Sequence, residues 1–237
     1  MPSLKGKTVL IIGRGSGIAR AIALAVSEDG GRVIVAGRHP CDLASAYSGQ
    51  EVGVELVDVT DEASIAALAG RVGALDHVVA TASARARGSY RDLSASLVNT
   101  SFSTKVTGPL LLAKHFAGQL APDGSFLFMS GATALKPAPG MLAVAATNAA
   151  VNAITAGLAV ELAPIRVNAI APGTIDTGAY DALGEEGKAR LFRARSTANP
   201  VRRIGTAEDV AAAAVAALTN GFLTGVSLPV DGGEHLV

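Results

Sequence analysis

The sequence predicts an α/β fold in which helices cover both faces of a parallel sheet of about seven strands. Short apolar runs of strand length alternate with segments of helical spacing, and a glycine-rich turn separates the first run from the first helix. The length of 237 residues suits one domain with a sizeable core, spanning residues 1–237. The strand-like runs are Thr8–Ile12, Arg32–Ala36, Val52–Val57, His77–Ala80, Ser125–Met129 and Val167–Ala171.

The first helix follows the first strand directly. Ile18, Ile22 and Val26 recur every four residues, so they lie on one helix face, which we expect to turn toward the sheet. The run Asp29-Gly30-Gly31 then ends the helix.

Three later segments complete the outline. Thr206 predicts the start of a helix over residues 206–219, because its hydroxyl can cap the helix while Asp209 reaches back to the backbone. Residues 136–140, Lys-Pro-Ala-Pro-Gly, predict a loop. Residues 174–200 predict a longer surface segment, and long loops in such folds usually carry function.

Composition narrows the class of partner and the compartment. The 20 basic and 20 acidic residues give a net charge of +0, so nucleic acid is not expected as a partner. The only cysteine, Cys41, cannot form an internal disulfide, and the start of the chain lacks a signal-peptide pattern, which favours the cytoplasm. Apolar stretches are interrupted before the roughly 20 residues that a membrane span needs, so no membrane association is expected.

The turn between the first strand and the first helix predicts a nucleotide site. Glycines there let the backbone approach a pyrophosphate, and the positive end of the helix attracts its charge. A glycine-rich turn alone also fits a plain tight connection between strand and helix. The residues expected at the nucleotide are Gly13, Arg14, Ser16, Gly17 and Ile18.

Further segments match a known family in order. With the glycine turn, they resemble the short-chain dehydrogenase/reductase family over residues 4–233, and the resemblance implies a Rossmann fold. Ile12 departs from the family's threonine, and Ala19 from its last glycine. The other matching segments are Asp58-Val59-Thr60-Asp61, Ala80-Thr81-Ala82-Ser83, Ala159-Val160-Glu161-Leu162, Arg166–Gly173 and Val230-Asp231-Gly232-Gly233.

The resemblance implies where a nicotinamide dinucleotide binds. The segment after the third strand contacts the adenine, and the segment after the fourth strand stands where the family has Asn-Asn-Ala-Gly. The segment after the sixth strand meets the nicotinamide end, where Ile175 offers backbone groups and Thr177 offers a hydroxyl near the pyrophosphate. The implied positions are Asp58, Val59, Thr81, Ala82, Ser83, Pro172, Gly173, Ile175 and Thr177.

The end of the second strand predicts the cofactor. A carboxylate there binds a free ribose 2′-hydroxyl, whereas an arginine accommodates a 2′-phosphate. This chain has Ala36-Gly37-Arg38 and no acid, and Arg14 offers a second guanidinium group. NADP, as NADPH, is therefore the expected cofactor; the alternative is that Arg38 is a solvated loop residue.

The family's catalytic residues are the weakest part of the match. Members reduce carbonyls with a hydride from the nicotinamide, a proton from a tyrosine, and a supporting lysine, serine and asparagine. The match at residues 149–153 places Val144 at the tyrosine position, Asn148 at the lysine position and Gly131 at the serine position, with Ser130 just before it. The three tyrosines of the chain are Tyr47, Tyr90 and Tyr180.

The asparagine and the lysine have exchanged places. Lys105 stands where the family has its asparagine, and the resemblance implies that positions 105 and 148 face each other near the nicotinamide ribose. Pro109 cannot donate a hydrogen bond to the carbonyl of Lys105, so the helix is expected to bend there. The alternative is drift after loss of catalysis, with Lys105 filling space or reaching solvent.

These observations leave competing functions. The first is an NADP(H)-dependent oxidoreductase in which Lys105 or water donates the proton, Ser130 holds a carbonyl and Asn148 completes the set; ordinary ketones are then reduced weakly. The second is a non-catalytic NADP(H)-binding scaffold or redox sensor. A lyase or isomerase fits less well, because no paired acid and base can be read from the sequence.

Partners follow from two segments. The alanine-rich helix from about 142 to 162 presents small residues on one side, and by resemblance this surface forms homodimers or homotetramers. A small-molecule substrate is expected beneath residues 174–200, and no metal is expected. Several residues are ordinary surface candidates for substrate contact: Arg85, Arg87, Tyr90, His115 and Tyr180.

Overall fold

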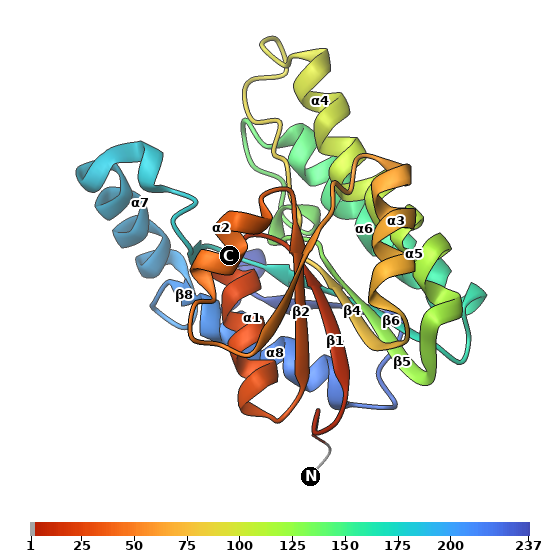
Figure 1. Ribbon diagram of the computed structural model, residues 1–237. Helices are drawn as coiled ribbons and strands as arrows, with labels where there is room; N and C mark the ends of the chain where they lie inside the picture. Colours follow the sequence, from red (N-terminus) through yellow and green to blue (C-terminus); the bar gives the residue numbers. More distant parts are fainter. Residues whose placement is uncertain (1–2) are drawn as a thin grey trace.

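The computed structural model describes residues 3–237 and contains one seven-stranded sheet in the order β3-β2-β1-β4-β5-β6-β9, with every pairing parallel. Figure 1 shows the strands crossing the middle of the molecule. The strands are β1 Thr8–Ile12, β2 Arg32–Gly37, β3 Val52–Leu56, β4 Leu75–Ala80, β5 Leu120–Met129, β6 Arg166–Pro172 and β9 Ser227–Val230. Two short strands, β7 Ile175–Asp176 and β8 Gly205–Thr206, pair separately.

All six strands that the apolar runs predicted are present, and the expected α/β class is confirmed. The apolar runs did not include β9, which lies at the sheet edge. It is short, only partly buried and contains Pro229, so it lacks the apolar run that marks the buried strands.

Helices cover both faces of the sheet, and each face has its own apolar core. In Figure 1, α1 and α8 lie on one side and α3, α5 and α6 on the other. The helices are α1 Gly17–Glu28, α2 Pro40–Ala46, α3 Glu62–Val72, α4 Ala95–Phe102, α5 Gly108–Phe116, α6 Leu142–Glu161, α7 Gly184–Ala198 and α8 Ala207–Thr219. A π-helix, η1 Ser103–Thr107, joins α4 to α5, and the 3₁₀ turns are η2 Ala117–Gln119, η3 Ala132–Ala134, η4 Asp181–Leu183 and η5 Glu234–Leu236.

The two helix boundaries read from the sequence are confirmed. Ile22 and Val26 of α1 are buried, and the helix stops before Asp29. At the start of α8, Asp209 donates its backbone N–H to the Thr206 hydroxyl at 3.3 Å, and the Asp209 carboxylate accepts from the Thr206 N–H at 2.8 Å. This reciprocal pair is the predicted capping box.

The segment 174–200 is not the long loop that the sequence predicted. Most of it forms α7, which projects from the body of the molecule in Figure 1. No residue of α7 is buried, so the helix has no apolar stripe to reveal it. Its polar sequence still suits a helix, because Glu185 and Glu186 lie in the first turn and Arg195 in the last.

The expectation that every apolar stretch is too short to span a membrane is also wrong. By length and composition, α6 qualifies, with 20 residues and a mean hydropathy of 1.5. Its Val151 and Leu158 belong to the core, packed against the sheet, and it also buries the polar side chains of Thr147, Asn148 and Thr155. One face of the helix therefore packs on the core, and the rest of its apolar surface is not buried within this chain.

Candidate active site

Three segments meet at the carboxyl ends of the strands, around the glycine turn. Thr81 donates its N–H to the Ile12 carbonyl at 2.8 Å, and a Cβ added at Gly13 would lie 2.1 Å from the Thr81 hydroxyl oxygen. Gly17 has a φ of +57°, and a Cβ there would lie 3.0 Å from the Thr177 Cβ. Glycine is therefore required at both positions, by close approach at the first and also by conformation at the second.

The turn leaves the start of α1 open. Ser16 precedes the helix in an extended conformation and makes no side-chain cap, so the first backbone N–H groups lack that partner. Arg14 and Ser16 are exposed and Ile18 is half-buried. This helix terminus, with an exposed guanidinium group beside it, has the chemistry of an anion site.

The ends of β2 and β3 place opposite charges near each other. Arg38 is exposed and makes no hydrogen bond or ion pair within residues 3–237. The Asp58 carboxylate accepts from the Thr60 hydroxyl at 2.7 Å and from the Thr60 N–H at 2.9 Å. These bonds, and then the Arg38 charge, lower the pKa of Asp58. Asp58 thus fixes the turn after β3 beside a free guanidinium group.

A buried polar cluster lies next to this edge. Lys105, on the π-helix η1, donates from Nζ to the Asn148 side-chain oxygen and to the Ser130 carbonyl, the latter at 3.1 Å. The Ser130 hydroxyl donates to the Asn148 carbonyl at 3.0 Å. The structure therefore brings together Lys105, Ser130 and Asn148 from η1, the end of β5 and α6.

The cluster extends to a residue that the sequence analysis missed. The Asn148 amide nitrogen donates to the Thr133 hydroxyl at 2.7 Å, and Thr133 is half-buried where the other three side chains are buried. The sequence held a signal for Thr133, because this residue follows the buried strand β5 within a few positions. Binding sites in such folds lie at the carboxyl ends of the strands.

Gly131 explains why the asparagine fits. A Cβ at this position would lie 2.6 Å from the Asn148 amide nitrogen, so a serine at 131 would collide with Asn148 as it stands. The side-chain choices at positions 105, 131 and 148 are therefore linked by space as well as by hydrogen bonds.

Burial changes the acidity of Lys105. Desolvation, and then the charge of Arg85, lowers its pKa from 10.5 to about 7. A small cavity lies against this side chain, lined by Val59, Ala82, Thr104, Met129 and neighbouring residues, with room for about one water molecule. The ammonium group therefore gains or loses a proton near neutral pH, next to a space that can hold water.

The π-helix sets the direction of Lys105. Gly108 donates its N–H to the Ser103 carbonyl five residues earlier, and Pro109 lies in the first turn of α5. The irregularity expected near Pro109 is thus a π-turn, a feature that often marks functional sites.

No tyrosine joins the cluster. Tyr47 is buried in the core on the α1 face, Tyr90 is exposed, and Tyr180 packs edge-on against Phe192 with ring centroids 5.7 Å apart. Val144 is buried within α6.

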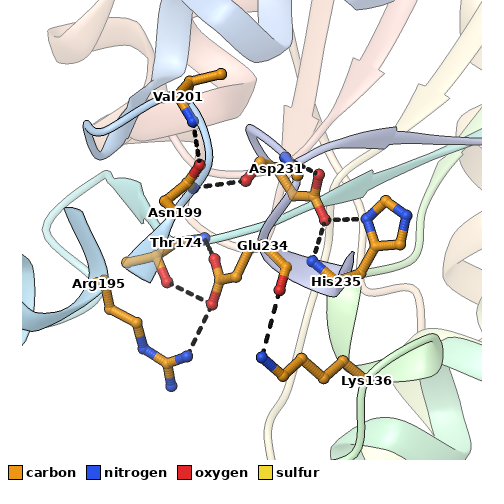
Figure 2. Close-up of polar contacts among 9 residues, drawn as sticks. Lys136, Thr174, Arg195, Asn199, Val201, Asp231, Glu234 and His235 are labelled. Carbon is orange, nitrogen blue, oxygen red and sulfur yellow. Dashed lines mark hydrogen bonds and ion pairs between the residues drawn. The ribbon is translucent and has the colours of Figure 1, made fainter. Parts of the chain in front are cut away.

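Figure 2 shows how the segment after β6 is held. Glu234 accepts from the Thr174 N–H at 2.7 Å, from the Thr174 hydroxyl at 3.1 Å and from Arg195 at 3.0 Å. Pro172 and Gly173 lie just before this contact, Ile175 is buried after it, and the half-buried Thr177 reaches Gly17. The sequence did not point to Glu234, because no local pattern links it to a residue 60 positions earlier.

The other sequence-predicted residues lie at the same edge. Val59 and Ala82 line the small cavity with Lys105, whereas Ser83 is exposed. Asp58 and Arg38 lie farther along, after β3 and β2.

Comparison with known proteins gives consistent matches. The family model described as enoyl-(acyl carrier protein) reductase matches residues 12–235. The short-chain dehydrogenase/reductase ATR9 of Stachybotrys chlorohalonatus is 31% identical over 258 aligned positions, covering 100% of both chains.

Solved structures agree. A small-chain dehydrogenase crystallised in complex with NADPH is 33% identical, with a TM-score of 0.87 over 98% of this chain and 99% of that one. The MalC reductase/Diels-Alderase of Malbranchea aurantiaca is 28% identical, with a TM-score of 0.91 over 99% of this chain and 98% of that one. The chain is a member of the short-chain dehydrogenase/reductase family.

Proposed function

We propose that this protein is an NADP(H)-dependent oxidoreductase that acts on a small carbonyl compound with an atypical catalytic set. The observation that carries the proposal is the direct hydrogen bond from Lys105 to Asn148, which keeps an ammonium group and an amide together where the family has lysine and asparagine in exchanged positions. Drift after loss of catalysis gives no reason for both functional groups to persist in contact.

The glycine turn fits the cofactor, because the start of α1 has no side-chain cap and Arg14 and Ser16 beside it are exposed. NADPH is supported by Arg38 and Arg14, and by the NADPH complex of the similar dehydrogenase. When bound, the cofactor supplies a hydride. The residues proposed to hold it are Gly13, Arg14, Ser16, Gly17, Ile18, Arg38, Asp58, Val59, Thr81, Ala82, Ser83, Pro172, Gly173, Ile175 and Thr177.

Lys105 takes the part of the family's tyrosine as proton donor. Its lowered pKa, about 7, lets it release a proton near neutral pH. The adjoining cavity has room for a water molecule that can pass this proton on. The Ser130 hydroxyl is engaged by the Asn148 carbonyl, which makes Ser130 a positioning residue. The Thr133 hydroxyl accepts a hydrogen bond from Asn148 and keeps its own O–H free. That O–H is therefore proposed to donate a hydrogen bond to the substrate carbonyl oxygen, while Lys105 supplies the proton.

The remaining assignments follow the family. We propose one cofactor-binding domain over residues 1–237, a cytoplasmic location, and a homodimer or homotetramer formed through α6. Ala149, Ala153 and Ala156 are exposed on that helix, and Ala145 is half-buried beside them, so another copy can approach closely.

The test follows NADPH absorbance with a panel of aldehydes, ketones, quinones and imines across a range of pH. With Lys105 as donor, kcat/KM for reduction is highest below pH about 7 and falls about tenfold per unit above it, because the protonated form is then depleted.

Lys105→Met removes this activity and its pH dependence, whereas Lys5→Met, at an exposed site, leaves both unchanged. Tight NADPH binding with no oxidation by any compound would contradict catalysis and leave the non-catalytic scaffold or redox sensor.

A further inference from the structure

Two arginines, Arg85 and Arg87, lie close to the proposed site. The loop of residues 81–89, between β4 and α4, carries Arg85 and Arg87, both exposed, on either side of the buried Ala86. From the sequence alone, both were ordinary surface candidates for substrate contact, and their placement in the fold now singles them out.

The loop is held at both ends and in the middle. Thr81 bonds the Ile12 carbonyl, the Ser101 hydroxyl donates to the Ala84 carbonyl at 2.8 Å, and Gly88 donates its N–H to the Gly140 carbonyl at 3.0 Å. Ala82, at the start of the same loop, lines the cavity beside Lys105. Arg85 and Arg87 therefore project from a fixed segment close to the buried cluster.

Arg87 connects this loop to the segment after β6. Its guanidinium carbon lies 5.9 Å from the centre of the Tyr180 ring, and Tyr180 packs on Phe192 of α7. The two arginines thus lie between the Lys105 cluster and residues 174–200, the segment expected to cover a substrate.

Cations act on one another in this part of the molecule, and only Tyr180 acts in the opposite sense on Arg85. Arg87 and Arg14 act on Arg85, and Arg85 acts on Lys105, in each case with repulsion that disfavours the charged form. Arg85 is exposed, yet neighbouring protein atoms remove part of the water around its guanidinium group. This desolvation is the main reason that the pKa of Arg85 is lowered.

No carboxylate balances these groups. Within residues 3–237, neither Arg85 nor Arg87 forms a hydrogen bond or ion pair, and three acids on or against the segment after β6 are engaged elsewhere. Asp176 and Asp181 bind Lys188 at 2.9 and 2.7 Å, and Glu234 binds Arg195 at 3.0 Å. A chain of net charge +0 thus places unpaired cations close together beside the proposed site.

We infer that Arg85 and Arg87 form a subsite for an anionic group, a carboxylate or phosphate, on the substrate. The inference rests on the proposed function for the identity of the site. Guanidinium groups bind both oxyanions through paired N–H donors, and the partial desolvation of Arg85 strengthens the attraction. Arg14 and the start of α1 are assigned to the cofactor phosphates, whereas Arg85 acts on Lys105 and Arg87 contacts Tyr180 on the substrate side.

The experiment compares two probes of the same shape and different charge, 4-carboxybenzaldehyde and 4-formylbenzamide. Their binding is measured by calorimetry on the full-length protein, with and without saturating NADP⁺, so no turnover is required. The wild type should bind the carboxylate at least about tenfold more tightly than the amide, and Arg85→Ala and Arg87→Ala should each remove most of that preference. The control variant Arg32→Ala changes an exposed arginine at the amino end of β2, and it should preserve the preference.

Two results would overturn the inference. One is equal binding of both probes by the wild type, or a preference that survives in Arg85→Ala and Arg87→Ala. The other is a loss of NADPH affinity in these two variants with the probe preference unchanged, which would assign the arginines to the cofactor phosphates. Loss of NADPH oxidation affects neither measurement, so failure of the proposed function is separately visible.

Discussion

At the scale of single residues, Arg38 is the sharpest determinant of cofactor choice. It follows β2 directly and is exposed, and its charge acts on Asp58, whose carboxylate is already bonded to Thr60. An approaching phosphate therefore meets a guanidinium group that no other residue within 3–237 holds. This arrangement favours a phosphorylated ribose over a free one.

Replacement of Arg38 by alanine should weaken NADPH binding by about tenfold to a hundredfold and leave NADH nearly unaffected. Charge-assisted hydrogen bonds contribute roughly 1.5–3 kcal/mol, and only the 2′-phosphate would receive them. Calorimetric titration of both nucleotides measures the difference, with Arg32→Ala as the control for net charge. Equal affinity of the wild type for the two nucleotides would refute the assignment.

Individual residues also show how much of the site could be predicted from the sequence. The facing of positions 105 and 148 was expected from the family register, and the hydrogen bond between them agrees with it. Thr133 and Glu234 were not expected as site residues. Thr133 had a local signal in its place after β5 but no sign of its bond to Asn148, and Glu234 enters only through a contact to a residue distant in sequence. Strand ends can be read from local pattern, but such pairings depend on tertiary packing.

At the scale of elements, the Lys105 to Asn148 bond ties the π-helix η1 to α6. The π-turn places an extra residue in the helix before Pro109, and Lys105 lies buried in the middle of it. By contrast, α7 was missed as a helix, because helices without a buried face give no periodic apolar signal. A helix is thus predictable from sequence to the extent that it packs.

The coupling between η1 and α6 should be measurable. Lys105→Asn and Asn148→Lys should each harm NADPH binding or activity, and the double exchange should recover part of the loss, with a coupling energy of about 0.5–3 kcal/mol. Contact residues are non-additive because each single variant leaves a buried partner without its bond.

The double-mutant cycle has an internal control. The same cycle run with Lys5→Met and Asn148→Lys pairs an exposed, distant lysine with the same asparagine, and it should be additive. Additivity at Lys105 as well would make that lysine a structural residue.

At the scale of the whole molecule, the sheet order explains why distant segments share one site. All seven strands run parallel, so their carboxyl ends lie at a single edge, and the loops after β1, β2, β3, β4, β5 and β6 all open there. The alternation of strands and helices made this edge predictable. The buried charge at that edge has a consequence for global stability.

The burial of the Lys105 ammonium group should make the free energy of unfolding depend on pH. Its pKa is about 7 in the folded protein and 10.5 when solvated. Below pH about 7 the group is charged in both states, and the full cost of burying that charge then lowers the free energy of unfolding. Between these values the unfolded chain binds more protons, and stability should rise with pH by up to about 1.4 kcal/mol per unit. Above 10.5 the effect is gone, and Tyr47, whose pKa burial raises to about 12, acts in the opposite direction.

Denaturant unfolding between pH about 7 and 9 isolates this contribution, since Tyr47 is neutral in both states there. The wild type should gain stability across the interval, and Lys105→Met should lose most of that slope, because no other lysine of residues 3–237 has its pKa lowered by burial to this range. Lys5→Met should retain the wild-type slope. The same slope in Lys105→Met would mean that the ammonium is solvated in the folded protein, and a solvated ammonium would also lack the lowered pKa on which its role as proton donor depends.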